Sequence, residues 1–402
     1  MLAQFYPPTI GGEENHVRNL ARIMHDRGHH VEVLTTAPGA SAQRTVVDRG
    51  VAVHYVRTSA QRLPWLYTDQ ERPHALPLPD PAMARAVEGA LANRRFDVVH
   101  AHNWIVNSAL GPAKRSGVPL VLTLHDYSHV CAVKRLMLRG AVCPGPGPLR
   151  CTLCAADHYG PVVGIATAGA NGRGRRARND AVAAFVSVSD AVARHNGLPP
   201  DGERSFVVPN FVADSLVDPH APPRPDGPVL FVGDVMPDKG IDVLVEAFRL
   251  LGSSLRLRIV GRGVPGVELA LPPGTRLLGP RSHDEVVAEM RAARLVVVPS
   301  VWADPCPTVV LEAMALARPV VGTRVGGITD MVADGVTGRL VAPGDAVALA
   351  AAIGEIAGRS DVLASYGSAG VARVGAFTAS RVAAELEGVY ERVARWAPAV
   401  PA

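Results

Sequence analysis

Short β-branched runs alternate with helix-like segments along the whole chain, and this rhythm constrains the fold more than any other feature. In the first half the runs occupy residues 31–35, 51–56, 97–101, 120–124, 185–188 and 206–208. In the second half they occupy residues 229–232, 257–260, 275–278, 295–298, 320–321 and 339–341. The segments between them have a helical pattern, as in residues 16–27, which end before Gly28. This order is typical of βαβ units around a parallel sheet.

A proline-rich segment, residues 218–228, interrupts the rhythm in the middle of the chain. Because proline lacks a backbone donor, such a segment forms neither a helix nor a central strand. A chain of 402 residues also exceeds the size at which a single hydrophobic core keeps growing. We therefore predict an α/β protein with two Rossmann-like, doubly wound domains. Their predicted bounds are 1–218 for the N-terminal domain, 219–228 for a linker, 229–378 for the C-terminal domain, and 379–402 for a C-terminal helix, a candidate to cross back to the first domain.

The composition is that of a globular protein, with 48% hydrophobic and 19% charged residues. No apolar run reaches the roughly 20 residues that a membrane-spanning helix needs, so we expect a cytoplasmic protein, and we expect no nucleic-acid partner. The basic cluster at residues 173–178 suits an anionic acceptor or peripheral contact with membrane lipids, or it is only the solvated start of a helix. The opening residues leave little room for a first strand before Pro7, so a start further upstream is an alternative.

Two glycine-containing turns follow predicted strands, where parallel α/β sheets bind their ligands. Gly11 and Gly12 precede the first helix, and a glycine pair lets a ligand approach the backbone amides. In the second half, the turn from Gly233 to Gly240 places Lys239 directly before a helix. An ammonium group at this place suits a diphosphate, because helix N-termini are positively polarised. The alternatives are that Gly11 and Gly12 form only a turn, and that Lys239 is a surface lysine.

The stretch from residue 298 to 314 carries two carboxylates after a buried strand. Asp304 lies in a proline-rich loop, and Glu312 lies on the following helix among apolar neighbours. Burying a carboxylate without a partner costs several kcal/mol, so sugar or ribose hydroxyls are the expected partners. The alternative is a capping aspartate and a glutamate at the edge of the core paired with an arginine.

This stretch resembles the signature of the retaining GT-B glycosyltransferases of family four, in which seven residues separate two carboxylates. Further motifs occur here in the family's order, and together they cover nearly the whole chain. They occupy residues 5–12, 27–29, 97–102, 239–240, 259–263, 304–315, 317–321, 326–327 and 334–338. The resemblance implies two Rossmann-like domains that face a central cleft.

The resemblance also implies roles for individual residues, with His102, Lys239 and Asp304 as the catalytic set. His102 would face the donor sugar, Lys239 would neutralise the phosphates, Asp304 would bind sugar hydroxyls and Glu312 would hold the ribose. The implied donor-binding residues are Gly12, Gly233, Lys239, Asp304, Cys306, Pro307, Thr308 and Glu312. The implied acceptor-binding residues are Gly11, His125 and Asp126. For His125 a satisfied strand-end histidine is the alternative.

Three positions depart from the family pattern. Asp304 stands where glutamate is usual, which shortens its reach to the sugar by one methylene group. Asp234 stands where many members have a phosphate-binding arginine, so Lys239 would act alone, or Arg262 or Arg324 would replace that arginine. Ala317 stands where glycine is usual, a change for which the sequence offers no interpretation.

Four of the five cysteines cluster in a glycine- and proline-rich insertion, which we place at residues 127–160. They are Cys131, Cys143, Cys151 and Cys154. The last two have the C-x-x-C spacing of half a zinc site, so a structural zinc ion is one interpretation. Disulfides, an iron–sulfur cluster and unlinked thiols are the others.

Together these observations predict transfer of a sugar from a UDP- or GDP-sugar to an acceptor hydroxyl, with retention of anomeric configuration. By the resemblance no cofactor is required for catalysis. The acceptor could be a small molecule, a lipid-linked molecule or a glycan. Another double-Rossmann enzyme, such as an epimerase or a phosphorylase, is the first alternative, and a catalytically silent scaffold that binds a partner is the second.

Overall fold

The computed structural model describes residues 1–7, 11–39, 43–63, 74–199, 202–221, 224–263 and 270–396. These residues form two compact units. Unit 1 contains residues 1–138, 143–209 and the chain from Val382 onward, and unit 2 contains residues 139–142 and 210–381. Residues 210–218, which we expected in the first domain, therefore group with unit 2.

Unit 1 is built around one sheet, with strand order β10-β9-β6-β5-β1-β2-β4-β3 in its described part. The strands are β1 (Leu2–Ala3), β2 (Glu32–Thr36), β3 (Arg44–Asp48), β4 (Val51–Val56), β5 (Val99–His102), β6 (Leu120–Leu124), β9 (Ala184–Ser187) and β10 (Ser205–Val207). Neighbours run parallel except the edge strand β3, which is antiparallel to β4. β5, β6 and β9 are buried along their whole length, as in parallel sheets covered on both faces.

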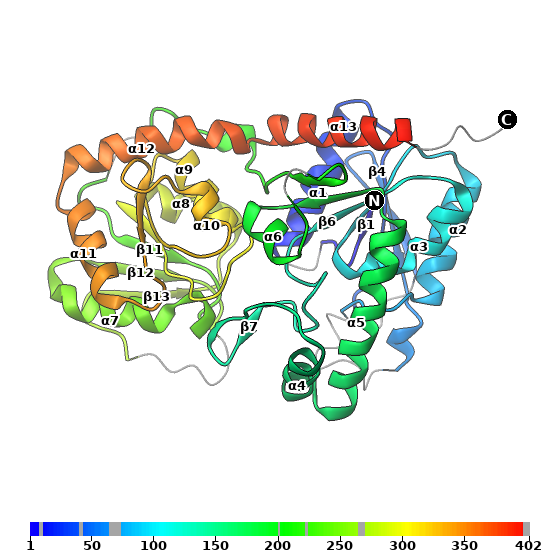
Figure 1. Ribbon diagram of the computed structural model, residues 1–402. Helices are drawn as coiled ribbons and strands as arrows, with labels where there is room; N and C mark the ends of the chain where they lie inside the picture. Colours follow the sequence, from blue (N-terminus) through cyan, green and yellow to red (C-terminus); the bar gives the residue numbers. More distant parts are fainter. Residues whose placement is uncertain are drawn as a thin grey trace. The chain divides into compact units, whose positions relative to one another are not determined.

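The helices of unit 1 follow its strands (Figure 1). They are α1 (Gly12–Asp26), α2 (Pro81–Asn93), α3 (Leu110–Ser116), α4 (Pro148–Tyr159), α5 (Pro161–Ala181) and α6 (Asp190–His195). The last helix, α13 (Ala379–Trp396), joins this unit from Val382 onward. Glu387 of α13 pairs with Arg27 after α1, and the Tyr390 hydroxyl lies 2.7 Å from Nδ1 of His100 on β5.

The predicted cysteine-rich loop contains a pair of helices. α4 and α5 are joined at Gly160, whose φ of 83° is a conformation that favours glycine. A Cβ atom on Gly164 would overlap the backbone oxygen of Ala155, so only glycine allows α5 to pack this closely against α4. Residues 127–160 therefore contain helix α4 and a two-stranded sheet of β7 (Met137–Leu138) and β8 (Ala141–Val142), and α5 follows directly after them.

Unit 2 has its own sheet, with order β13-β12-β11-β14-β15-β16 in the described residues. The strands are β11 (Val229–Val232), β12 (Leu257–Val260), β13 (Thr275–Gly279), β14 (Leu295–Val298), β15 (Val320–Thr323) and β16 (Gly338–Val341), all parallel to their neighbours. The helices are α7 (Ile241–Leu251), α8 (His283–Ala292), α9 (Thr308–Ala315), α10 (Ile328–Met331), α11 (Ala346–Ala357) and α12 (Ser360–Val374). Leu244, Phe248, Ile259, Leu295 and Ile353 belong to one buried core between sheet and helices.

Candidate active site

The turn after β11 in unit 2 positions Lys239. A single 3₁₀ turn (Pro237–Lys239) leads into Gly240, which has a φ of 72°. A Cβ atom on Gly240 would overlap the carbonyl oxygen of Pro299, so only glycine allows this approach to the loop after β14. The carbonyl oxygen of Asp238 accepts a hydrogen bond of 2.9 Å from the amide of Val301. The two loops are therefore tied together at the carboxyl edge of the sheet.

Lys239 and Asp304 form the central ion pair of this edge. The Lys239 ammonium lies 2.5 Å from Oδ2 of the buried Asp304, and the Ser300 hydroxyl donates to the same oxygen at 3.4 Å. The ammonium also lies 5.2 Å from the centre of the Trp302 ring. The structure thus brings together two of the predicted catalytic residues, and their charges compensate each other.

Gly326 and Gly327 hold the backbone of Asp304 in place. The amide of Gly327 donates a hydrogen bond of 2.8 Å to the carbonyl oxygen of Asp304. A Cβ atom on Gly326, whose φ is 52°, would overlap that same oxygen. The sequence pattern contained this glycine pair, but its contact with Asp304 became visible only in the structure.

Glu312 lies on α9, the helix that follows the Asp304 loop. Burial raises the pKa of Glu312, and the neighbouring His283 opposes this shift. Pro307 precedes α9 without a side-chain cap among the described residues, so the amides at the start of this helix, including that of Thr308, are available to a ligand. Cys306 is buried, and its carbonyl oxygen accepts a hydrogen bond of 2.9 Å from Asn210.

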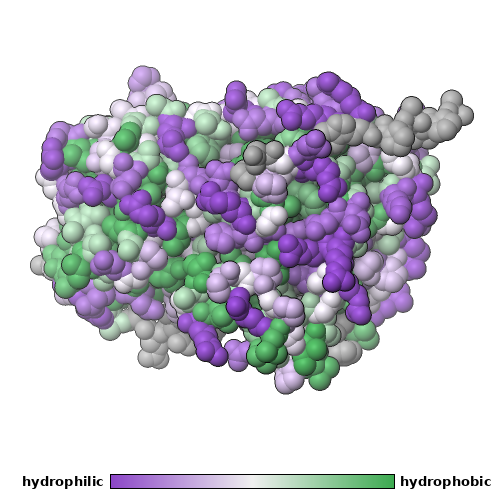
Figure 2. Space-filling view, viewed as in Figure 1, coloured by the Kyte–Doolittle hydropathy of each residue, from purple (hydrophilic) through white to green (hydrophobic). Residues whose placement is uncertain are grey.

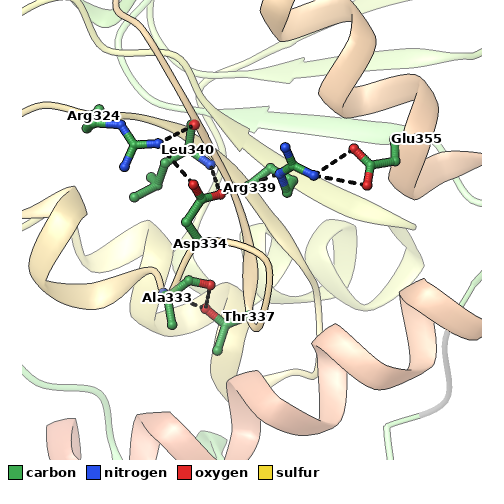
Figure 3. A network of polar contacts seen from close by, with 7 residues as sticks. All are labelled: Arg324, Ala333, Asp334, Thr337, Arg339, Leu340 and Glu355. Carbon is green, nitrogen blue, oxygen red and sulfur yellow. Dashed lines mark hydrogen bonds and ion pairs between the residues drawn. The ribbon is translucent and has the colours of Figure 1, made fainter.

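The arginines considered as substitutes near Asp234 are already paired. Arg262 lies 3.3 Å from Asp234, so the acid is partly neutralised by its own neighbour. Arg324 lies 2.9 Å from Asp334 and also donates to the carbonyl oxygen of Leu340 (Figure 3). Gly233, at the end of β11, has a φ of 155°. Lys239 is paired as well, and it differs from the two arginines in that its partner is the predicted sugar-binding Asp304.

In unit 1, α1 begins at Gly12 with Gly11 as its N-cap, and a Cβ atom on Gly11 would overlap the Glu14 carboxylate. Gly12 has open space at its Cβ position. The preceding residues of the predicted glycine turn, Pro8, Thr9 and Ile10, lie outside the described residues.

His102 ends β5 inside a group of four histidines. Its Nδ1 lies 2.9 Å from Nε2 of His125, which follows β6. The ring centre of His16, on α1, lies 4.9 Å from that of His125, and the ring centres of His100 and His102 lie 4.4 Å apart. His102 is fully buried, and its Nε2 has no hydrogen-bond partner among the described residues. Burial holds the pKa of His102 well below its usual value, with the other histidines adding to the shift. The predicted pair His102 and His125 is thus in contact.

Sequence reasoning missed Asn103, which joins three elements beside this pair. Asn103 has a φ of 54°, a conformation that is uncommon for residues other than glycine. Its side-chain oxygen accepts the amide of His125 at 3.0 Å, and its nitrogen donates to Glu13 at 2.8 Å and to Asp126 at 3.5 Å. Its position directly after His102 is the signal that could have identified it.

Glu13 and Lys134 were also missed, and they share a buried environment with Asp126. Burial, reinforced by Glu14 and Asp126, raises the pKa of Glu13 to about 8. Burial likewise raises the pKa of Asp126 and lowers that of Lys134. The Lys134 ammonium lies 4.5 Å from the centre of the Trp104 ring. Lys134 comes from the cysteine-rich insertion, which therefore contributes a charge to the surroundings of the predicted acceptor residues.

The five cysteines are free thiols, and Cys151 and Cys154 lie on α4. Within the described residues, no group of three or more His, Cys, Asp or Glu side chains is arranged to hold a metal ion. The cysteines as placed here do not form the predicted zinc site, and the zinc prediction rests on the sequence spacing.

Metal analysis of the purified protein tests that prediction. A structural zinc ion bound by the four cysteines gives about one equivalent of zinc, removed by a chelator only together with loss of folded structure. Replacing Cys154 with serine is expected to lower the zinc content to background, whereas Cys306→Ser, outside the cluster, leaves it unchanged. A metal content below about half an equivalent in the wild type contradicts the zinc interpretation.

The buried histidines of unit 1 predict acid sensitivity. Burial lowers the pKa of His16 to about 4 and the pKa values of His100 and His129 to about 3. Unfolded histidines bind protons below about pH 6.5, whereas these folded ones do not. The free energy of unfolding that these histidines contribute is therefore fully present above about pH 6.5 and is lost as the pH falls. Each group contributes up to about 1.4 kcal/mol per pH unit.

Glu13 and Asp126, whose pKa values are raised, act in the opposite direction, so we expect a net loss of about 2 kcal/mol between pH 6 and pH 5. Urea unfolding at pH 7, 6 and 5 measures this loss. In His129→Gln the loss is smaller by about 1 kcal/mol. A free energy of unfolding that stays constant from pH 7 to pH 5 contradicts the assignment.

Comparisons with known proteins agree with this geometry. Residues 10–216 match the family Glycosyltransferase Family 4, and residues 227–358 match the family Glycosyl transferases group 1. The D-inositol 3-phosphate glycosyltransferase of Xylanimonas cellulosilytica is 31% identical over 97% of this chain and 93% of its own length. The phosphatidyl-myo-inositol mannosyltransferase of Mycobacterium leprae is 29% identical over 98% of this chain and 96% of its own.

Solved structures share the fold at lower identity. Sucrose-phosphate synthase from Thermosynechococcus elongatus has a TM-score of 0.74 at 18% identity and covers 98% of both chains. HepE from Anabaena, solved in complex with UDP-glucose, has a TM-score of 0.68 at 19% identity, covering 97% of this chain and 98% of its own. The two parallel α/β units and both family matches give one conclusion: this chain is a GT-B glycosyltransferase of the glycosyl transferases group 1 family.

Proposed function

We propose that the protein transfers a sugar from a UDP- or GDP-sugar to an acceptor hydroxyl with retention of anomeric configuration. The observation that carries this proposal is the Lys239–Asp304 pair at the carboxyl edge of the unit 2 sheet, between the β11 turn and the start of α9. A cation, a carboxylate and helix-start amides stand together there. Retention and the identity of the donor as a nucleotide sugar follow from the family resemblance.

The departing diphosphate determines what the donor site must supply. Breaking the anomeric carbon–oxygen bond builds negative charge on the diphosphate, so preorganised positive groups stabilise the transition state. In this proposal Lys239 turns its ammonium to the phosphates, and the amides at the start of α9, at Thr308, add to it. Asp304 then accepts hydrogen bonds from sugar hydroxyls, and Gly233 leaves room for the phosphates.

Glu312 is proposed to bind the ribose of the donor. A carboxylate whose pKa is raised by burial gains stability from two hydroxyl donors, which a ribose provides. Replacing Glu312 with glutamine removes the charge but keeps one acceptor, so we expect the donor KM to rise about 10-fold, equivalent to about 1.4 kcal/mol. Glu246→Gln, on the exposed face of α7, is the matched control and should leave KM unchanged. A Glu312→Gln enzyme with the wild-type KM contradicts this role.

Unit 1 is proposed to bind the acceptor beside Gly11, His125 and Asp126, with His102 at the reacting centre and Gly12 near the diphosphate. These residues lie at the start of α1, at the last residue of β5 and directly after β6, the edge where parallel sheets bind ligands. A small molecule, a lipid-linked molecule and a glycan all present the hydroxyl that the reaction needs. No metal or cofactor takes part in the proposed reaction.

A panel of nucleotide sugars tests the function directly. Each UDP-, GDP- and ADP-sugar is incubated with the protein, and the released nucleoside diphosphate is measured. We expect turnover with one UDP- or GDP-sugar, and nuclear magnetic resonance of the product should show the donor's anomeric configuration. Turnover with inversion would contradict retention. Nucleotide binding without any hydrolysis or transfer across donors and acceptors would favour the scaffold alternative.

A further inference from the structure

The paired helices α4 and α5 expose large apolar side chains along α4 and in the first turns of α5. Leu149 and Leu153 on α4 are 72% and 61% exposed, and Val162 and Ile165 on α5 are 84% and 54% exposed. Figure 2 shows apolar side chains gathered where Figure 1 places α4 and the start of α5. Exposing so many large apolar groups on one short element indicates an interaction surface.

The exposed stripe of α5 changes character along the helix. Near the hairpin it consists of Val162, Ile165, Ala166 and Gly169, and further along it continues with Arg173 and Arg176, all of them exposed. The spacing of these residues is that of one helix face. Eight residues separate Ile165 from Arg173, which corresponds to about 12 Å along the helix axis. The apolar section and the basic section therefore follow each other along one face of α5.

Charge in this region is mainly positive. Between residue 131 and the end of α5 at residue 181 the sequence has eight basic residues and two acidic residues, Asp157 and Asp180. The basic residues are Lys134, Arg135, Arg139, Arg150, Arg173, Arg175, Arg176 and Arg178. Burial lowers the pKa of Lys134, and Arg178 donates a hydrogen bond to the buried Asn171. Among the exposed basic residues are Arg150, Arg173 and Arg176. A surface of this charge attracts an anionic partner and repels a second copy of itself.

We propose that the α4–α5 hairpin binds the surface of an anionic membrane. The four apolar side chains enter the boundary between headgroups and acyl chains, and Arg173 and Arg176 meet the lipid phosphates. Interfacial helices lie along the membrane surface, so the apolar and basic sections of α5 contact it side by side. Apolar insertion combined with basic residues is the known pattern of interfacial helices. Since none of the described helices is long and apolar enough to cross a membrane, this contact is peripheral.

Vesicle sedimentation tests the proposal. The full chain is mixed with vesicles of phosphatidylcholine alone or with 30% phosphatidylglycerol. We expect binding to the anionic vesicles that weakens at least 10-fold without phosphatidylglycerol and declines as salt is raised. Ile165→Glu and Leu153→Glu should each weaken binding at least 10-fold, and Arg173→Glu combined with Arg176→Glu should do the same.

Val47→Glu is the matched control, because Val47 is 74% exposed on the edge strand β3, away from the hairpin in sequence and structure. It should bind vesicles like the wild type. The proposal would be overturned if the wild-type protein did not bind anionic vesicles, or if the hairpin variants bound them as well as Val47→Glu does. A wild-type dimer that becomes monomeric in Ile165→Glu, measured by ultracentrifugation, would assign the surface to self-association instead. UDP binding is measured for each variant as well. We expect it to be unchanged, since the proposed UDP site lies in unit 2, so a failure of the membrane proposal can be told apart from a failure of the proposed function.

Discussion

Replacing Lys239 with alanine is expected to weaken the binding of UDP or GDP at least 100-fold. The ammonium lies in the turn that is proposed to hold the diphosphate, and it also neutralises the buried Asp304 at 2.5 Å. Its removal deletes a charge-assisted hydrogen bond and leaves an uncompensated carboxylate facing an anionic ligand. These two effects together amount to about 3 kcal/mol or more, which corresponds to a change of about 100-fold or more in Kd.

Calorimetric titration with each nucleotide measures this loss. Lys114→Ala is the matched control, because Lys114 is an exposed lysine near the end of α3 and lies in the other unit. A double variant, Lys239→Ala with Asp304→Asn, separates the two effects. If repulsion by Asp304 contributes, the double variant recovers part of the affinity. Wild-type affinity in Lys239→Ala would remove this residue from the donor site.

Replacing His102 with alanine is expected to lower kcat by about 100-fold to 10,000-fold, the range that a positioned catalytic side chain contributes. The affinity for UDP or GDP should change by less than about threefold, because the diphosphate groups are proposed to lie in unit 2. This division follows from the geometry: His102 belongs to β5 of unit 1, whereas Lys239 and Asp304 belong to unit 2.

Folding of the His102 variant needs its own control, since His102 is fully buried beside His100 and His125. His102→Asn keeps a polar side chain of smaller volume, and circular dichroism with thermal unfolding identifies the better-folded variant. His220→Asn, at an exposed loop position, is the matched control for turnover. A folded His102 variant with wild-type kcat would exclude His102 from catalysis.

Most strands of the two sheets could be predicted from the sequence because buried parallel strands are continuous apolar runs. The predicted bounds of β4, β6, β11, β12 and β14 agree with the structure at every residue. β3 was missed because all but one of its residues are exposed and its pattern lacks alternation. α5 was missed because its glycines and arginines interrupt the helical spacing of its apolar residues. Its close contact with α4 depends on Gly164, which matters only once the two helices pack together.

Sequence patterns indicated more candidates for the proposed donor side than for the proposed acceptor side. Lys239, Asp304 and Glu312 each follow a strand of unit 2 or lie on the next helix, so local pattern was enough to select them as candidates. Asn103, Glu13 and Lys134 come from three separate segments that meet only after folding. The pairing of Lys239 with Asp304 was likewise outside the reach of the sequence, which indicated ligand contacts for both residues but not their contact with each other.

A crystal structure of the complex with UDP would test the central assignment most directly. The account predicts a phosphate oxygen within about 3 Å of the Lys239 Nζ atom, with the ribose hydroxyls at Glu312 and the Lys239–Asp304 contact lengthened. UDP bound with its diphosphate remote from Lys239, while the ion pair to Asp304 stays intact, would contradict the account.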